Sequence, residues 1–165
     1  MQLMRAVGRL CSIILATYAD KTMLAFLCSA TPHSVNSRNK TAKAAYYAKL
    51  VAAFQRYHPS AVPITSNLYG FVCYFYKSKT QFDADNLSKP VWDALVNTAY
   101  QDDSIVRLRT SGLIDQDSNE IDAIDVTHMP DTVLDDFLDM LDDESHIIYV
   151  EMGPLDYGFF RFGGK

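Results

Sequence analysis

The chain of 165 residues is 48% hydrophobic and 21% charged, with a formal net charge of −5 at pH 7. This composition is that of one ordinary globular domain, and it excludes a disordered chain or a collagen-like repeat. Three separated cysteines and four isolated histidines argue against a disulfide framework and against a zinc site of the usual ligand spacing. We therefore expect reduced thiols, a cytoplasmic protein, and chemistry that depends on other residue types.

The first 22 residues are expected to form an N-terminal extension, and residues 23–165 a single domain. Arg5 and Arg9 precede an apolar run at residues 10–19, which weakly resembles a signal peptide. That run is too short to span a bilayer. An amphipathic extension, or translation that starts at Met23, explains the segment better, and we expect no membrane association.

In chain order, the first half of the domain contains a buried strand, a helix and a central strand. An apolar run predicts the first strand at residues 23–29, and an alanine-rich apolar pattern predicts a helix at 41–57. Residues 68–76 are apolar and aromatic on both faces, which is typical of a central strand. Another helix is expected at 85–98 with Asp85 as its N-cap, because its apolar residues recur at helical spacing.

The second half continues with a strand at 104–110 and an acidic, irregular stretch at 111–125. An amphipathic helix is predicted at 131–143 and a last strand at 146–152. Together these elements predict the α+β class: a small mixed β-sheet packed with helices, with an acidic helical insertion at 111–145 before the last strand.

Charge is distributed unevenly along the chain. Between Lys21 and Phe82 there is no acidic residue, whereas every acidic residue except Asp20 lies at or beyond Asp83. Such a chain can present a basic face to phosphates despite its negative net charge. The alternative is that solvated faces are segregated by chance, so the distribution is only a hint of nucleic-acid binding.

Four aspartates are the candidate catalytic residues of the sequence. Asp83 and Asp85 point the same way if their segment is extended, and Asp102 and Asp103 return after a helix and a short turn. We expect three of these carboxylates to meet at one end of adjacent strands. Because crowded carboxylates repel one another, a hard cation such as Mg²⁺ would relieve the repulsion and could activate water for phosphodiester hydrolysis.

Lys89 is a further candidate catalytic residue beside the four aspartates. It lies six residues after Asp83, near the start of the same predicted helix. From there its ammonium group could stabilise the attacked phosphate or the leaving oxygen. A turn followed by a helix cap would explain Asp85 fully and Asp83 in part, but it would not explain Lys89 and the Asp102–Asp103 pair at these spacings.

The run from Asp83 to Leu95, followed by Asp102 and Asp103, resembles the RusA family of Holliday junction resolvases. That family carries an Asp-x-Asp-Asn-Leu-x-Lys motif, then Asp-x-Leu on the same helix, then Asp-Asp before a strand. The resemblance covers roughly residues 23–110 and the last strand. It implies a homodimer that binds four-way DNA junctions and nicks them symmetrically with Mg²⁺ or Mn²⁺.

The resemblance also implies roles for individual residues. Asp83, Asp85 and Asp103 match the family's essential metal-binding acids, Lys89 matches its essential lysine, and Asp102 matches a companion acid that we include among the metal ligands. No nucleotide cofactor is implied. We expect the DNA backbone to be contacted by basic residues, some of which could instead be ordinary strand-end charges: Arg38, Lys40, Lys43, Lys77, Lys79, Arg107 and Arg109.

Two other functions remain open from the sequence. The chain could be a junction-binding, architectural protein without catalysis, which would show no metal-dependent nicking. It could also be an interaction protein that acts through the acidic helix at 131–143, although a solvated face over a small apolar stripe explains that helix more simply.

Overall fold

The computed structural model describes residues 23–34, 38–77 and 82–160. In these residues, four strands alternate with three helices, and the elements in chain order are β1 (Leu24–Ser29), α2 (Lys40–Tyr57), β2 (Leu68–Tyr76), α3 (Ala84–Leu95), β3 (Val106–Asp115), α4 (Asp131–Asp143) and β4 (His146–Pro154). Short 3₁₀ turns are η1 (Asp103–Ile105), η2 (Ile121–Ala123) and η3 (Tyr157–Phe159). None of the helices in these ranges is long and apolar enough to cross a membrane.

The strands form one mixed sheet in the order β1-β4-β2-β3. β4 is antiparallel to both β1 and β2, whereas β2 and β3 are parallel. Parallel neighbours need a crossover connection, and α3 supplies it between β2 and β3. The observed architecture confirms the α+β class and the mixed sheet.

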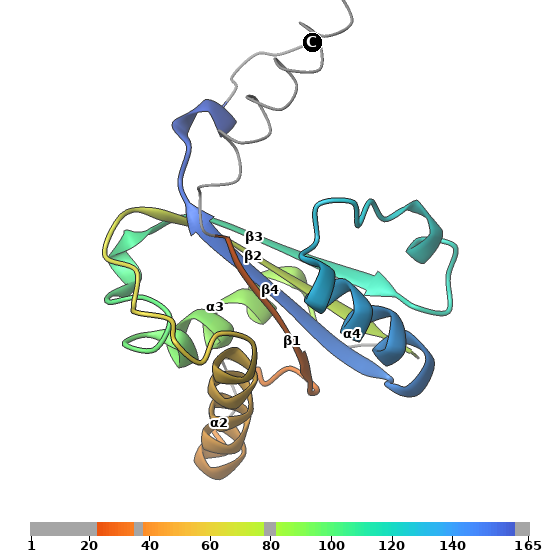
Figure 1. Cartoon of the computed structure of the whole chain (residues 1–165). Helices are drawn as coiled ribbons and strands as arrows, with labels where there is room; N and C mark the ends of the chain where they lie inside the picture. The colour runs from red at the N-terminus through yellow and green to blue at the C-terminus, as the bar shows by residue number, and fades with distance from the viewer. Residues whose placement is uncertain (1–22, 35–37, 78–81, 161–165) are drawn as a thin grey trace, which may run out of the picture.

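Helices cover both faces of the sheet (Figure 1). On one face, Leu50 and Phe54 of α2 and Trp92 of α3 belong to the larger apolar core. On the other face, Val133 and Phe137 of α4 pack into a second, smaller core. The sheet is therefore the middle layer of three, and α3, which contains Asp85 and Lys89, lies on the same face as α2.

Gly70 allows α3 to approach the sheet closely. A side chain at Gly70 on β2 would overlap the ring of Trp92, which is completely buried. The hydroxyl of Tyr100, also completely buried, donates a hydrogen bond to the backbone carbonyl of Trp92 at 2.5 Å. These contacts fix the second half of α3 against β2 and against the turn that leads to β3.

Most of the predicted elements are confirmed, and the bounds of two of them are wrong. The N-cap of α3 is Asp83, not Asp85, and the helix ends at Leu95 because Val96 is extended and Asn97 has a positive φ of 62°. β3 runs to Asp115, five residues beyond the predicted end at residue 110, because its second half pairs with the end of β2. Asp83 is extended, but Asp85 lies inside the helix. The two acids therefore do not share the extended segment on which the expectation of a common direction depended.

The acidic stretch contributes to the packed structure. Its first five residues belong to β3, and its helix, predicted at 131–143, is α4 with the same bounds. Lys79 and Cys11 lie outside the described residues.

Candidate active site on helix α3

The N-terminal turn of α3 carries Asp83 and Asp85, both of which are exposed. The Asp83 carboxylate accepts a hydrogen bond of 3.0 Å from the backbone N–H of Asn86 and so caps the helix. Asp85 lies within the first turn, where the partial positive charge of the helix end favours a carboxylate. Both acids therefore fit the local structure of a helix start and also offer oxygens to solvent.

Ser111 attaches this helix start to the sheet. Its Oγ donates a hydrogen bond of 2.7 Å to the carbonyl oxygen of Ala84, between the two acids. Ser111 pairs with Val72 in the middle of β2. The N-terminus of α3 therefore lies over the middle of β3.

Lys89 is one turn after Asp85 and projects from the same side of the helix. Its ammonium nitrogen is 3.1 Å from Oδ1 of Asp93, and the Lys89 side chain remains 54% exposed. A second hydrogen bond, 3.4 Å long, reaches Oδ2 of Asp93 from the hydroxyl of Tyr47 on α2. The lysine is thus available to a ligand while it is anchored on one side.

Asp102 and Asp103 lie at the other end of α3. Asp102 caps η1, and hydrogen bonds from Ser104 hold its pKa below the usual range. β3 then begins at Val106, which pairs with Leu68 at the start of β2. α3 itself has 12 residues and, at a rise of about 1.5 Å per residue, spans about 18 Å.

The four aspartates are not assembled into one metal-binding group in the part of the chain that the structure describes. No group of three or more histidine, cysteine or acidic side chains in the described residues is placed to hold a metal. Asp83 caps α3, Asp85 and Lys89 lie in its first turns, and Asp102 and Asp103 lie at the start of η1. The assignment of all four acids as metal ligands remains a prediction.

Comparison with known proteins agrees with the motif on α3. A family model described as Endodeoxyribonuclease RusA matches residues 29–122, which is more than half of the 165 residues. The chain belongs to the RusA family. RusA proteins are endonucleases that act on Holliday junctions, and they generally depend on a divalent metal. No curated protein matches the chain significantly.

The RusA match extends from the end of β1 through α2, β2, α3 and β3 to η2. It includes the motif on α3 and the Asp102–Asp103 pair, and it stops before α4. The acidic α4 and the final strand β4 are outside the matched range, although both contribute buried residues to the fold.

The acid pair of this RusA chain fits a hard divalent cation. Carboxylate oxygens are the preferred ligands of Mg²⁺, which often uses only one or two protein carboxylates beside water and substrate phosphates. Asp83 and Asp85 offer such oxygens at an exposed helix start, and one Asp83 oxygen remains besides the one that caps the helix. Mn²⁺ has similar preferences, so the pair does not discriminate between the two ions.

The basic residues that were predicted to contact DNA are in different situations. Arg38 and Lys40 are exposed at the start of α2, and Lys43 lies 5.1 Å from the ring centre of Tyr47. Lys77, in contrast, donates hydrogen bonds to the carbonyl oxygens of Leu141 and Asp142 at the end of α4. Lys77 therefore binds the end of α4, on the opposite face of the sheet from α3.

Arg107 and Arg109 lie at the start of β3. The strand register shifts there, so that consecutive residues of β2 pair with Val106 and Leu108 and Arg107 is skipped. Arg109 donates a 3.2 Å hydrogen bond to the backbone carbonyl of Asp103 and lies 3.9 Å from its carboxylate. This pairing places a positive charge beside the second acid pair, which the sequence alone did not predict.

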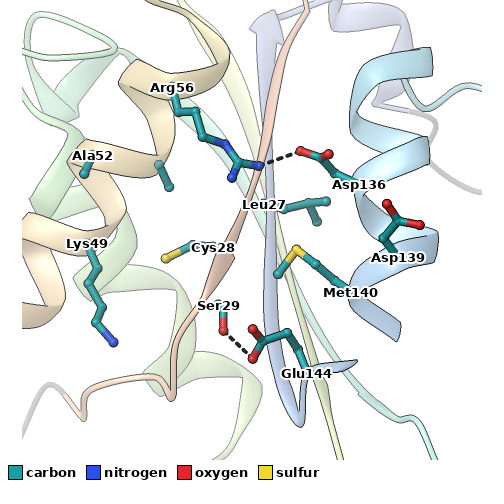
Figure 2. Close-up of a pocket in the computed structure, with 11 residues that line it drawn as sticks. Leu27, Cys28, Ser29, Lys49, Ala52, Arg56, Asp136, Asp139, Met140 and Glu144 are labelled. Carbon is teal, nitrogen blue, oxygen red and sulfur yellow. Dashed lines mark hydrogen bonds and ion pairs between the residues drawn. The ribbon is translucent and has the colours of Figure 1, made fainter. Parts of the chain in front are cut away.

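A large cavity lies elsewhere, between α2 and α4 beside β1, with a volume of about 510 Å³ (Figure 2). Arg56 of α2 and Asp136 of α4 form an ion pair of 2.5 Å across it, and Ser29 donates a 2.6 Å hydrogen bond to Glu144. None of the predicted catalytic residues lines this cavity. The ion pair joins α2 to α4, and the hydrogen bond joins β1 to the end of α4.

Proposed function

We propose that this chain is a metal-dependent endonuclease that hydrolyses phosphodiester bonds in four-way DNA junctions, with a role in recombination and repair. The observation that carries the proposal is the arrangement of Asp83, Asp85 and Lys89 at the exposed start of α3. Two acids and a lysine within seven residues combine a cation-binding group with a phosphate-binding group.

Asp83 and Asp85 would hold the divalent cation. When bound, such an ion activates a water molecule and neutralises charge on the attacked phosphate. The chain contributes the position of the acids: Asp83 is fixed by its bond to Asn86, and the backbone between the acids is fixed by Ser111.

Lys89 would bind a non-bridging oxygen of the attacked phosphate. Its positive charge stabilises the additional negative charge that the phosphate develops during hydrolysis. The partial positive charge at the start of α3 acts in the same direction, because unpaired backbone N–H groups there attract phosphate. Lys40 and Lys43 on α2, with Arg38 just before it, would hold the flanking DNA backbone, which explains the basic first half of the sequence.

A homodimer would match the two-fold symmetry of a four-way junction and make two symmetric nicks. Asp102 and Asp103 would belong to the metal site only if the assembled enzyme brings them near Asp83 and Asp85, because the described residues hold no such group.

The test is cleavage of a synthetic four-way junction and of a linear duplex of the same sequence, with and without Mg²⁺ or Mn²⁺. Wild type is compared with Asp85→Asn, and Asp122→Asn, which replaces an exposed acid of η2, is the matched control. We expect paired nicks on the junction only, lost in Asp85→Asn and retained in Asp122→Asn.

Three results would contradict parts of the proposal. Cleavage by Asp85→Asn at the wild-type rate would remove Asp85 from the site. Tight junction binding by wild type without nicking in any metal would make the chain an architectural protein. Equal cleavage of the linear duplex would remove the junction specificity.

A further inference from the structure

Lys89 has an acid one helical turn away on each side. Asp85 precedes it by four residues and Asp93 follows it by four, so both are within reach along the helix surface. In the structure the ammonium group pairs with Asp93, and Asp85 forms no ion pair within the described residues.

The preferred order of acid and lysine along a helix would favour Asp85 as the partner of Lys89. An acid that precedes a lysine by four residues forms a better pair than an acid that follows it, because that orientation agrees with the helix dipole. A contact from outside α3 therefore has to explain the choice of Asp93.

That contact comes from α2. The hydroxyl of Tyr47 donates a hydrogen bond of 3.4 Å to Oδ2 of Asp93, which leaves Oδ1 for Lys89. The Asp93 side chain is 30% exposed, whereas Asp85 is an exposed residue. Because charges attract more strongly away from bulk water, the half-buried carboxylate is the stronger partner for the lysine.

We propose that Asp93, held by Tyr47, is a positioning residue that keeps Lys89 away from Asp85 and so leaves the Asp85 carboxylate available to a divalent cation. This inference rests on the proposed function, in which Asp83 and Asp85 hold that ion. An ammonium group paired with Asp85 would occupy the same oxygens as the cation and would repel it.

The test measures Mn²⁺ binding in the absence of DNA, by electron paramagnetic resonance of the free ion. Asp93→Asn keeps the shape of the side chain and weakens its attraction for Lys89. We expect it to raise the Kd for Mn²⁺ by about two- to fivefold, the range of one partly exposed ion pair. Tyr47→Phe should raise the Kd in the same direction and by less, and Asp93→Glu should restore part of the affinity.

A second variant shows whether the effect passes through Lys89. In a Lys89→Met background no ammonium group can move to Asp85, so adding Asp93→Asn should leave the Kd unchanged. An equal loss of affinity in that background would overturn the proposal, since Asp93 would then act on the ion directly. Thermal unfolding of each variant shows that the fold is retained.

The remaining outcomes separate this inference from the proposed function. If Mn²⁺ binding is lost in Asp85→Asn while Asp93→Asn binds as wild type does, only the positioning role is wrong. If wild type shows no Mn²⁺ binding that depends on Asp85, the proposed metal site fails, and this inference fails with it.

Discussion

Ser111 on β3 donates a hydrogen bond to the carbonyl oxygen of Ala84, and this bond joins the middle of the sheet to the backbone between Asp83 and Asp85. Ser111→Ala should cost about 1 kcal/mol, the usual net value of such a bond. That corresponds to a lower Tm by about 2–4 °C for a chain of this size.

The same variant should cleave junctions more slowly than its lost stability explains, because the two acids would no longer be fixed relative to the sheet. Cleavage is measured well below the Tm, with Ser111→Thr as the control that keeps the hydroxyl. An unchanged rate in Ser111→Ala would show that this bond supports the fold without setting the site.

The sequence predicted most of the fold because most elements have regular apolar patterns. Strand β2 and helix α4 have the predicted bounds. The start of α3 was wrong because Asp83 and Asp85 are equally good N-caps by residue type, and the choice is made in three dimensions, where the carbonyl of Ala84 meets Ser111.

The second half of β3 shows a different limit of sequence analysis. Residues 111–125 were predicted to be an acidic, irregular stretch, and glycine and aspartate are depleted in strands. Residues 111–115 form a strand because Val72 to Tyr76 of β2 pair with them in register, and that partner lies more than thirty residues earlier in the chain.

Asp83 is predicted to have two separable roles, as helix cap and as metal ligand. Asp83→Asn should unfold at nearly the wild-type temperature, because asparagine caps helices as well as aspartate does, but it should not cleave. Asp83→Ala should lose cleavage and also about 1 kcal/mol of stability. Urea unfolding and junction cleavage of both variants check this, and normal cleavage by Asp83→Asn would leave Asp83 as a cap only.

Lys40 and Lys43 should contribute to DNA binding, and Lys77 should not. If each lysine on α2 contacts one phosphate, its replacement by alanine lowers the slope of log Kd against log salt concentration by about 0.9. Lys77→Ala is the matched control: it should keep the slope and lower the free energy of unfolding, because Lys77 binds the last carbonyls of α4. A reduced slope in Lys77→Ala would place this residue on the DNA.

Helix α4 should be essential to the fold although the family match ends before it. Phe137 is 2% exposed, and its ring centre is 4.8 Å from that of Phe75 on β2. Phe137→Ala should cost about 3–5 kcal/mol. Leu138→Ala, one residue later on the exposed side of α4, should change stability by less than about 0.5 kcal/mol. Similar values for both variants would mean that α4 is not packed on the sheet.

The two buried cysteines predict how stability depends on pH. Burial raises the pKa of Cys28 to about 11, against an opposing effect of Lys49, and burial raises the pKa of Cys73 to about 12. Unfolded thiols ionise near pH 9, so between pH 9 and 12 the folded chain binds more protons than the unfolded chain. The free energy of unfolding should therefore fall as the pH rises through this window.

Urea unfolding between pH 8 and 11 measures this fall, and the double variant Cys28→Ala, Cys73→Ala should show a shallower one. Part of the fall should remain, because burial also raises the pKa of Tyr57 and of Tyr74 to about 12. Alkylation gives an independent check: since the thiolate is the reactive form, iodoacetamide at pH 8 should modify both cysteines far more slowly in the folded chain than in urea. Rapid modification of Cys73 in the folded chain would contradict its burial beneath α4 and the loop before it.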